Sequence, residues 1–126
     1  MPVLRSATPI LFVRDVTASA RFFHEKLGFA IDFLYGTPPF YGSVSRDGAC
    51  LHLRFVHEPV FAEAAAGEES LIVATVETDD VGALFAEFQA RGVAFAQELI
   101  KQAWGGTDFQ IRDPDGNAVS FVSFAA

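Results

Sequence analysis

The residues of this chain that could do chemistry gather in a few short runs. The only tryptophan, Trp104, precedes two glycines, and Asp108, Gln110 and Arg112 follow it at alternate positions. Side chains at alternate positions of a strand share one face. Carboxylate, amide and guanidinium groups beside an indole ring suit the binding of a small molecule by hydrogen bonds and ring stacking. We therefore predict that this stretch contributes to a binding site.

A second run of candidate residues is the strand-like segment 49–56. Alternation of apolar and polar side chains divides it into two faces, and the polar face carries Cys50, His52 and Arg54. His52 could accept a proton as a general base, or it could only form hydrogen bonds or stabilise the fold. Cys50 has no neighbouring base that would activate its thiol, so we interpret it as a structural cysteine.

A divalent metal needs several converging ligands, and the sequence does not supply them. His52 and Ser120 occupy equivalent places, because each lies four residues after the glycine of an Asp-Gly turn. The place equivalent to His52 therefore holds a hydroxyl, and one imidazole cannot hold a catalytic cation. We interpret His24, on a predicted helix, and His57, at the start of a predicted linker, as surface or structural residues. We expect no metal, no other cofactor and no catalytic nucleophile.

Helix and strand signals arrange these residues in two similar units. Each unit reads strand, helix, strand, strand, strand, over residues 7–56 and 70–124, with a linker at 57–69. The helices begin at Asp-Val pairs and end at a glycine, and an Asp-Gly turn recurs in each unit. One unit alone would leave a sheet face uncovered, so we predict an α+β fold of two βαβββ modules in one domain, 1–126.

Composition narrows the classes of partner. Sixteen acidic and nine basic residues give a net charge of −7, which disfavours nucleic acid and anionic membranes and favours a cationic small molecule. The 14 phenylalanines suit either a Phe-rich core or an aromatic pocket and subunit interface. No apolar stretch approaches the ~18 residues of a membrane span, and no signal segment is visible. We therefore predict a cytoplasmic protein without a membrane partner.

Three stretches carry a resemblance to a known family. They are TPILFVRDV at 8–16, FHEKLGFAIDF at 23–33 and QAWGGTDFQIRDPDGNAVSFV at 102–122. Together with the repeated module, they resemble the vicinal oxygen chelate superfamily of glyoxalases, extradiol dioxygenases and antibiotic-resistance proteins, and within it the bleomycin resistance proteins. The resemblance implies a cupped mixed sheet around a cleft, with the helices on the outer face of the sheet.

The resemblance also implies ligand-binding residues. Asp32, Phe33, Phe40, Trp104 and Gly105 match ligand-contacting positions of the bleomycin resistance proteins. An ordinary amphipathic strand remains the alternative explanation for Asp32 and Phe33. The predicted ligand-binding set is completed by Tyr41, which follows Phe40 on the same loop, and by four residues chosen from alternation: His52, Arg54, Asp108 and Arg112.

Assembly and function follow as expectations. In the resembling family the first strand is exchanged between subunits around a proline, and Pro9 stands at the matching position, so we expect a homodimer. The leading hypothesis is non-catalytic binding and sequestration of a bleomycin-like antibiotic or planar metabolite in an aromatic-lined cleft. The alternative is a metal-dependent glyoxalase-like lyase or isomerase, or a dioxygenase. A small accessory module with a vestigial cleft is a third hypothesis.

Overall fold

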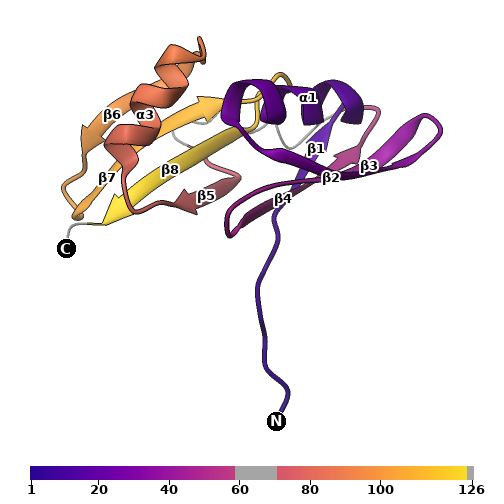
Figure 1. Cartoon of the computed structure of the whole chain (residues 1–126), viewed down its shortest axis with the longest axis horizontal. Coiled ribbons are helices and arrows are strands. Elements are labelled where there is room, and N and C mark those ends of the chain that lie inside the picture. Colours follow the sequence, from indigo (N-terminus) through magenta and orange to yellow (C-terminus); the bar gives the residue numbers. More distant parts are fainter. Residues whose placement is uncertain (59–70, 125–126) are drawn as a thin grey trace.

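A computed structural model describes residues 1–58 and 71–124. The first module consists of β1 (Ile10–Val13), α1 (Val16–Leu27), β2 (Ala30–Gly36), β3 (Pro39–Arg46) and β4 (Ala49–Phe55) (Figure 1). The second consists of β5 (Ala74–Glu77), α3 (Val81–Ala90), β6 (Phe95–Lys101), β7 (Gly106–Arg112) and β8 (Ala118–Phe124). The α+β class and the two βαβββ modules are confirmed.

Each module forms its own four-stranded sheet. The strand orders are β1-β4-β3-β2 and β5-β8-β7-β6. Both sheets are mixed, because β1 pairs with β4 and β5 pairs with β8 in parallel, whereas the other neighbours are antiparallel. Figure 1 shows α1 lying against the first sheet and α3 against the second, so one face of each sheet is covered by a helix.

The two helices begin and end at the residues that the repeat indicates. Asp15 caps α1, because its carboxylate accepts a hydrogen bond of 3.0 Å from the backbone N–H three residues later. Asp80 does the same for α3, also at 3.0 Å. Gly28 and Gly92 follow the two helices with φ of 73° and 74°, a left-handed conformation that L side chains rarely adopt. Local sequence therefore sets the length of both helices.

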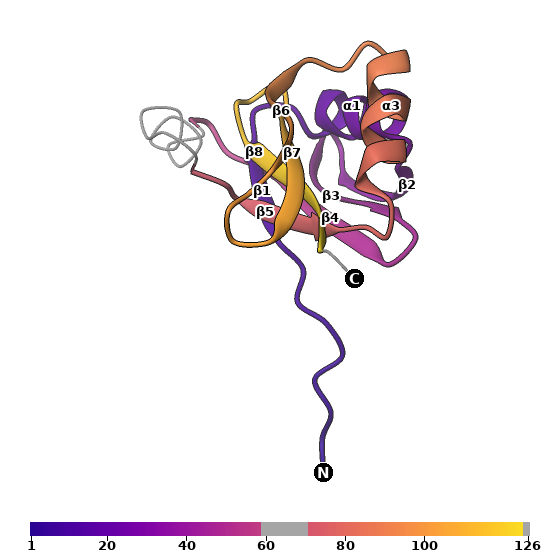
Figure 2. The same ribbon diagram turned by 90° about the vertical axis from the view of Figure 1, so that its left-hand side faces the viewer.

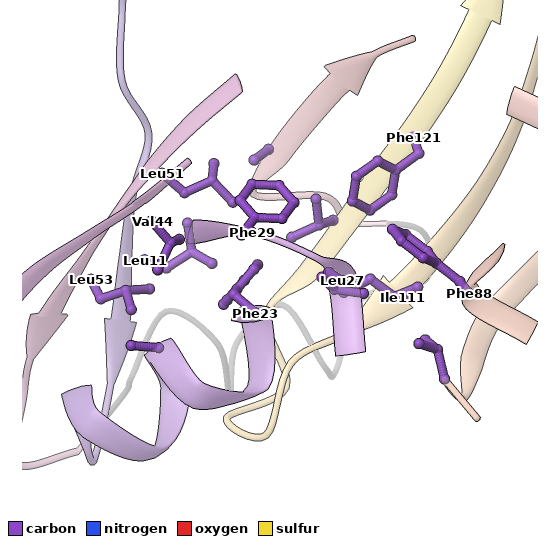
Figure 3. Packing of buried hydrophobic residues seen from close by; sticks show 14 of the residues in the cluster. Leu11, Phe23, Leu27, Phe29, Val44, Leu51, Leu53, Phe88, Ile111 and Phe121 are labelled. Atoms are coloured by element: carbon purple, nitrogen blue, oxygen red, sulfur yellow. The ribbon is translucent and has the colours of Figure 1, made fainter. Parts of the chain in front are cut away.

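One hydrophobic core joins the modules. Phe29 and Leu51 of the first module belong to the same buried cluster as Phe88 and Phe121 of the second (Figure 3). The ring of Phe121 also stacks on that of Phe109, with centroids 5.3 Å apart. Part of the excess of phenylalanine is thus explained by the core. Other phenylalanines are exposed and belong to the surfaces described below.

The turn between β7 and β8 ties the second module to β1. The Asp113 carboxylate is 5% exposed and accepts hydrogen bonds from the backbone N–H groups of Asp115 and Asn117. The Asn117 amide donates to the backbone carbonyl of Phe12, and Asp115 accepts from the backbone N–H of Arg14. These carboxylates are therefore structural, as their place in the repeat predicts.

The N-terminal arm, residues 1–9, has no helix or strand and extends away from both sheets (Figures 1 and 2). The first strand begins at Ile10 rather than at Ala7, because proline has no N–H for a ladder. The carbonyl of Pro9 still accepts a hydrogen bond of 2.9 Å from the N–H of His52. Most of the predicted linker at 57–69 lies outside the described residues. None of the described helices is long and apolar enough to cross a membrane.

Candidate functional site

Each sheet has one face that is covered by a helix and another that is directed away from the helix, which we call its open face, although side chains bury the middle of the second one. In β4, Leu51 and Leu53 belong to the core, so His52 between them points to the open side. In β7, Phe109 belongs to the core and Asp108 points away. Residues paired in register share a face. The first open face comprises Ile10, Phe12, Asp32, Phe33, Tyr35, Tyr41, Ser43, His52 and Arg54. The second comprises Thr75, Glu77, Gln97, Gly106, Asp108, Gln110, Ser120, Val122 and Phe124.

The first open face centres on His52 and two aromatic rings. The Tyr41 hydroxyl and His52 Nδ1 form a hydrogen bond of 2.9 Å, and their ring centroids are 5.3 Å apart. The ring of Phe33 meets the imidazole edge-on at 6.1 Å. His52 is only half-buried, so its other ring nitrogen can meet a ligand. This group offers both ring contacts and one hydrogen bond to a planar molecule.

A β-bulge brings Asp32 and Phe33, two neighbouring residues of the predicted site, to the same face of the first sheet. The register of β2 against β3 shifts between Ile31 and Phe33. As a result, the Asp32 carboxylate accepts hydrogen bonds of 2.9 and 2.7 Å from the hydroxyls of Ser43 and Ser45. Phe33, the next residue, also lies on this face, against His52. Simple alternation along a strand would have placed these neighbours on opposite faces.

Phe40 lies apart from His52, at the end of the β2–β3 hairpin. Its ring meets that of Tyr35 at 5.3 Å and lies over Gly36, where an added Cβ would overlap it. Gly36 has φ of 105°, which favours glycine for a second reason. The half-exposed pair of rings extends the aromatic surface toward the hairpin end.

The second open face carries Trp104 at one end. Its ring lies over Gly106, where an added Cβ would overlap the indole atoms, and it meets the ring of Phe124 at 5.9 Å. The Trp104 side chain is 60% exposed. Gly105, with φ of 106°, makes the turn that folds the indole back over β7. An exposed, supported ring of this kind can stack on a planar ligand.

Polar side chains occupy the middle of the second open face. Asp108 is 4% exposed, and its Oδ1 accepts hydrogen bonds from the side-chain amides of Gln97 and Gln102, at 2.8 and 2.9 Å. Gln110 donates in turn to Gln97, at 3.2 Å. The face therefore combines an aromatic end with a fixed polar centre.

The predicted arginines differ from the other residues of the set. Arg112 is exposed and donates to the carbonyl of Gly116 in its own turn, at 3.0 Å. Six residues of strand separate it from Gly106, about 20 Å, so it does not meet Trp104. Arg54 is exposed beside Tyr41 in the register of the first sheet. The structure thus places Arg112 at the far end of the second open face.

The donor groups at the equivalent strand positions do not fit a catalytic divalent cation. His52 lies opposite Ser43 and Ile10, and Ser120 lies opposite Gln110 and Thr75. Within residues 1–58 and 71–124, no three His, Cys, Asp or Glu side chains converge as a metal site would need. One imidazole among hydroxyl and amide groups is better suited to hydrogen bonding than to holding such an ion.

Within one chain the two open faces remain separate. In the described part of the chain, no hydrogen bond, ion pair or ring contact joins a residue of one face to a residue of the other. A cavity of about 510 Å³ lies at the junction of the modules and the root of the arm, and it reaches Thr75 and Glu77 at one edge of the second open face. Its walls include Ala7 and Pro9, the β5 residues Thr75 and Val76, and core rings such as Phe88.

Several residues of these faces were missed by sequence reasoning. Phe124, which supports Trp104, alternates with Val122 and Ser120 and could have been placed by continuing that alternation. Gln97 and Gln102 bind Asp108 from β6 and from the residue after it. No local motif marks these two amides, because their role depends on the pairing of β6 with β7.

Comparison with known proteins gives one family and a consistent fold. The model of the Glyoxalase/Bleomycin resistance protein/Dioxygenase superfamily matches residues 5–121. The bleomycin-binding protein from bleomycin-producing Streptomyces verticillus, solved with copper(II)-bleomycin, is 27% identical with a TM-score of 0.80; the match covers 99% of this chain and 100% of that one. The bleomycin resistance determinant encoded on the transposon Tn5 is 22% identical, with a TM-score of 0.75, and 98% and 100% are covered.

An enzyme-related protein shares the fold as well. A glyoxalase-related enzyme from Clostridium phytofermentans is 20% identical with a TM-score of 0.76, and 98% of each chain is covered. At this level of identity the likeness shows the fold alone. No curated protein sequence matches the chain.

Proposed function

Because the chain belongs to the glyoxalase/bleomycin resistance protein/dioxygenase superfamily, we propose that it binds and sequesters a small molecule without transforming it. The ligand is a bleomycin-like antibiotic or another planar metabolite. The bleomycin-binding protein of Streptomyces verticillus, which is similar over nearly the whole chain, supports this class of ligand. Sequestration keeps such a molecule away from its target.

The observation that carries the proposal is the supported, exposed indole of Trp104. An indole that is 60% exposed keeps much of its apolar surface in water, and that surface is buried when a flat ligand covers it. The ring is held between Gly106 and Phe124, so little conformational freedom is lost on binding. A second set of rings lies on the first open face and consists of Phe33, Tyr41 and His52.

We propose that the cleft forms between two chains of a homodimer. The first open face of one protomer then faces the second open face of its partner, which closes a space that neither chain encloses alone. Exposed apolar side chains on the first open face support this assembly: Ile10, Phe12, Phe33 and Tyr35. Such a cluster is typical of interfaces and binding grooves.

The N-terminal arm supports exchange of a segment between these chains. Val3 and Leu4 are 76% and 98% exposed, an unfavourable place for apolar side chains in a monomer. The cavity of about 510 Å³ begins at Ala7 and Pro9 and is walled by β5, whose outer edge is unpaired among the described strands. We propose that each arm, leaving at Pro9, packs against β5 of the partner protomer.

Titration of the intrinsic fluorescence tests the binding function directly, since Trp104 is the only tryptophan. A copper-free bleomycin is added to the purified protein, and quenching or a shift of the emission is expected below millimolar ligand. A response that is still absent at about 1 mM, where binding is worth only about 4 kcal/mol, rejects bleomycin as the ligand. Calorimetry on the same samples checks that the optical change reports binding.

A second candidate function is a lyase, isomerase or dioxygenase of the same superfamily. One observation favours it: Tyr41 holds His52 through Nδ1, which orients the other ring nitrogen toward the open face as a general base would require. Metal analysis of the purified protein separates the two functions. A stoichiometric divalent ion that is lost in His52→Ala would favour the enzyme.

The remaining partner predictions are part of the same proposal. The net charge of −7 suits a cationic ligand and disfavours nucleic acid and anionic membranes. We propose a single domain, 1–126, that acts in the cytoplasm. Immunoblotting of cell fractions measures the location. Protein found in the secreted fraction would contradict it.

A further inference from the structure

The turn between β7 and β8 holds β1 through one side chain, that of Asn117. Asn117 is 1% exposed, and its amide nitrogen donates to Oδ2 of Asp113 at 2.9 Å and to the backbone carbonyl of Phe12 at 3.1 Å. A carboxylate and a carbonyl accept hydrogen bonds and cannot donate them, so the amide must present its nitrogen to both. A single NH₂ group therefore joins the turn to β1.

The two oxygens of Asp113 differ in their ability to take up a proton. Oδ1 accepts from the backbone N–H groups of Asp115 and Asn117, at 3.0 and 2.8 Å, which uses both of its lone pairs. A backbone N–H group cannot turn round and accept. Oδ2 faces the Asn117 side chain, which can turn. A proton that binds to Asp113 must therefore go to Oδ2.

A proton on Oδ2 is incompatible with the present direction of the Asn117 amide. The new O–H group of Asp113 would point at an N–H group, and a buried hydroxyl without an acceptor is costly. If the amide turns over, its oxygen accepts from the Asp113 hydroxyl. That oxygen then also faces the carbonyl oxygen of Phe12, and two acceptors form no hydrogen bond. Protonation of Asp113 thus keeps the bond within the turn and removes the bond to β1.

Asp113 takes up this proton in mildly acidic solution. Its carboxylate is 5% exposed, and burial raises its pKa to about 6. The hydrogen bonds from Asn117 oppose the shift, and the charge of Asp115 adds to it. Arginine side chains keep their charge in this range, so those nearby do not titrate with Asp113. They end β7, follow β1 and lie opposite Phe12 in β4: Arg112, Arg14 and Arg54.

β1 has room to respond to the loss of this bond. It contains only four residues and lies at the edge of the first sheet, where it pairs with β4 alone among the described strands. A cavity of about 310 Å³ lies beside it, lined by Ile10, Leu11, Phe12, Val73 and Asn117. The other edge of β1 is therefore held by side-chain bonds from the turn and not by a strand.

We propose that Asp113 and Asn117 form a proton-controlled latch, which holds β1 to the second module at neutral pH and loosens it in mildly acidic solution. β1 carries Ile10 and Phe12 on the first open face and continues from the N-terminal arm (Figure 1). The latch lets the pH act on one wall of the proposed cleft and on the root of the arm. This inference goes beyond the proposed function and is independent of the ligand.

Hydrogen exchange of the unliganded full-length protein, followed by NMR, tests the latch. The reporter is the backbone N–H of Arg14, which donates to Asp115 and so closes the end of β1 against the turn. After correction for the intrinsic exchange rate, its protection should fall roughly fivefold from pH 7 to pH 5, as the loss of one hydrogen bond implies. Amides of α3, within the second module, should not lose protection. Unchanged or increased protection of Arg14 at pH 5 would overturn the inference.

Three variants make the assignment specific. Asp113→Asn cannot take up the proton, so the protection of Arg14 should no longer depend on pH. Asn117→Ala removes the amide, and protection should be low at both pH values. Asp47→Asn, in the equivalent turn of the first module, is the control and should behave like the wild type. A fivefold fall that persists in Asp113→Asn would overturn the inference.

A measurement on the wild type decides the matter even if the variants fold poorly. The ¹³C carboxyl resonance of Asp113 and the ¹⁵N side-chain resonance of Asn117 are followed through a pH titration. Both should change with one midpoint near pH 6, because the amide turns when the carboxylate takes up its proton. An Asn117 resonance that does not follow that of Asp113 would contradict the latch.

Discussion

Arg46 holds Glu87 with two hydrogen bonds of 2.8 Å, one from each terminal nitrogen of the guanidinium. Arg46 ends β3 and Glu87 lies on α3, so the ion pair joins the first module to the second. Arg46 also donates to the carbonyl of Leu27, and Arg91 approaches the same carboxylate at 3.3 Å. The hydrogen bonds from Arg46 lower the pKa of Glu87 below its ordinary value of 4.5.

Breaking this pair should weaken the contact between the modules. We expect Arg46→Met or Glu87→Gln to lower the free energy of unfolding by about 1 kcal/mol, because the pair is two-pronged but partly exposed. The lowered pKa means that this stabilisation is present at neutral pH and is lost as the pH falls below about 4.5. Urea unfolding of both single variants and the double variant gives the coupling energy. A coupling near zero would show that the pair contributes nothing.

The Trp104 ring should carry much of the ligand affinity. We expect Trp104→Ala to lose about 2 kcal/mol of binding free energy, roughly thirtyfold in Kd, because an aromatic anchor is removed. Stability should change by less than about 0.5 kcal/mol, since the side chain is largely exposed. Calorimetric titration measures the first quantity and thermal unfolding the second. Unchanged affinity would place the ligand elsewhere.

Gly106→Ala should displace the indole without removing it. The added methyl group overlaps the Trp104 ring, so the ring must leave its place beside Phe124. We expect a changed fluorescence emission and a loss of affinity of roughly tenfold. Gly48→Ala is the matched control, because no atom lies within 4 Å of a Cβ at that position. Equal behaviour of the two variants would contradict the placement of the ring.

Stability should rise as the pH is lowered from 7 to 5. Burial raises the pKa of Asp113 to about 6, from 3.8 for the ordinary carboxyl, although its hydrogen bonds with Asn117 oppose the shift. The folded state therefore binds a proton more readily, and its relative stability falls as the pH increases through about 4 to 6. The gain between pH 7 and pH 5 is expected to be about 1 kcal/mol.

Urea unfolding at the two pH values measures this gain. Asp113→Asn cannot titrate and should lose the gain, whatever its absolute stability. Asp47→Asn, in the equivalent turn of the first module, should keep it. The same gain in Asp113→Asn as in the wild type would assign the pH dependence to another group.

Removal of residues 2–7 should abolish the proposed dimer. The deleted segment contains the exposed Val3 and Leu4, which would lose their place against β5 of the partner. We expect light scattering to give the mass of a dimer for the full chain and of a monomer for the shortened one. Arg5→Ser, in the same segment, should remain dimeric. A full-length monomer at micromolar concentration would contradict both the assembly and the interchain cleft.

The sequence predicts those parts of the fold that depend on local signals. Asp15 and Asp80 begin the two helices and glycines follow them, since capping is decided within a few residues. The hairpin of β7 and β8 follows from the alternation of Phe109 and Ile111 with polar residues and from the turn after Arg112. The repeat makes each of these signals visible twice.

The missing parts of the candidate site depend on pairing between strands. The bulge that turns Asp32 and Phe33 to one face results from the register of β2 against β3, which the alternation of one strand does not reveal. Gln102 meets Asp108 only because the chain turns back after β6. The separation of the two open faces in one chain likewise depends on how the modules pack, and no short motif encodes that.

The equivalence of the two modules gives the proposed cleft a direction. Tyr41 and Asp108 occupy the same register position in their sheets, and so do Phe12 and Glu77. Rings in one module thus correspond to carboxylates in the other. A cleft with one wall from each module is asymmetric across its width. An elongated ligand with one apolar side and one charged side would therefore have a single preferred orientation. A dimer with twofold symmetry would then hold two such molecules pointing in opposite senses.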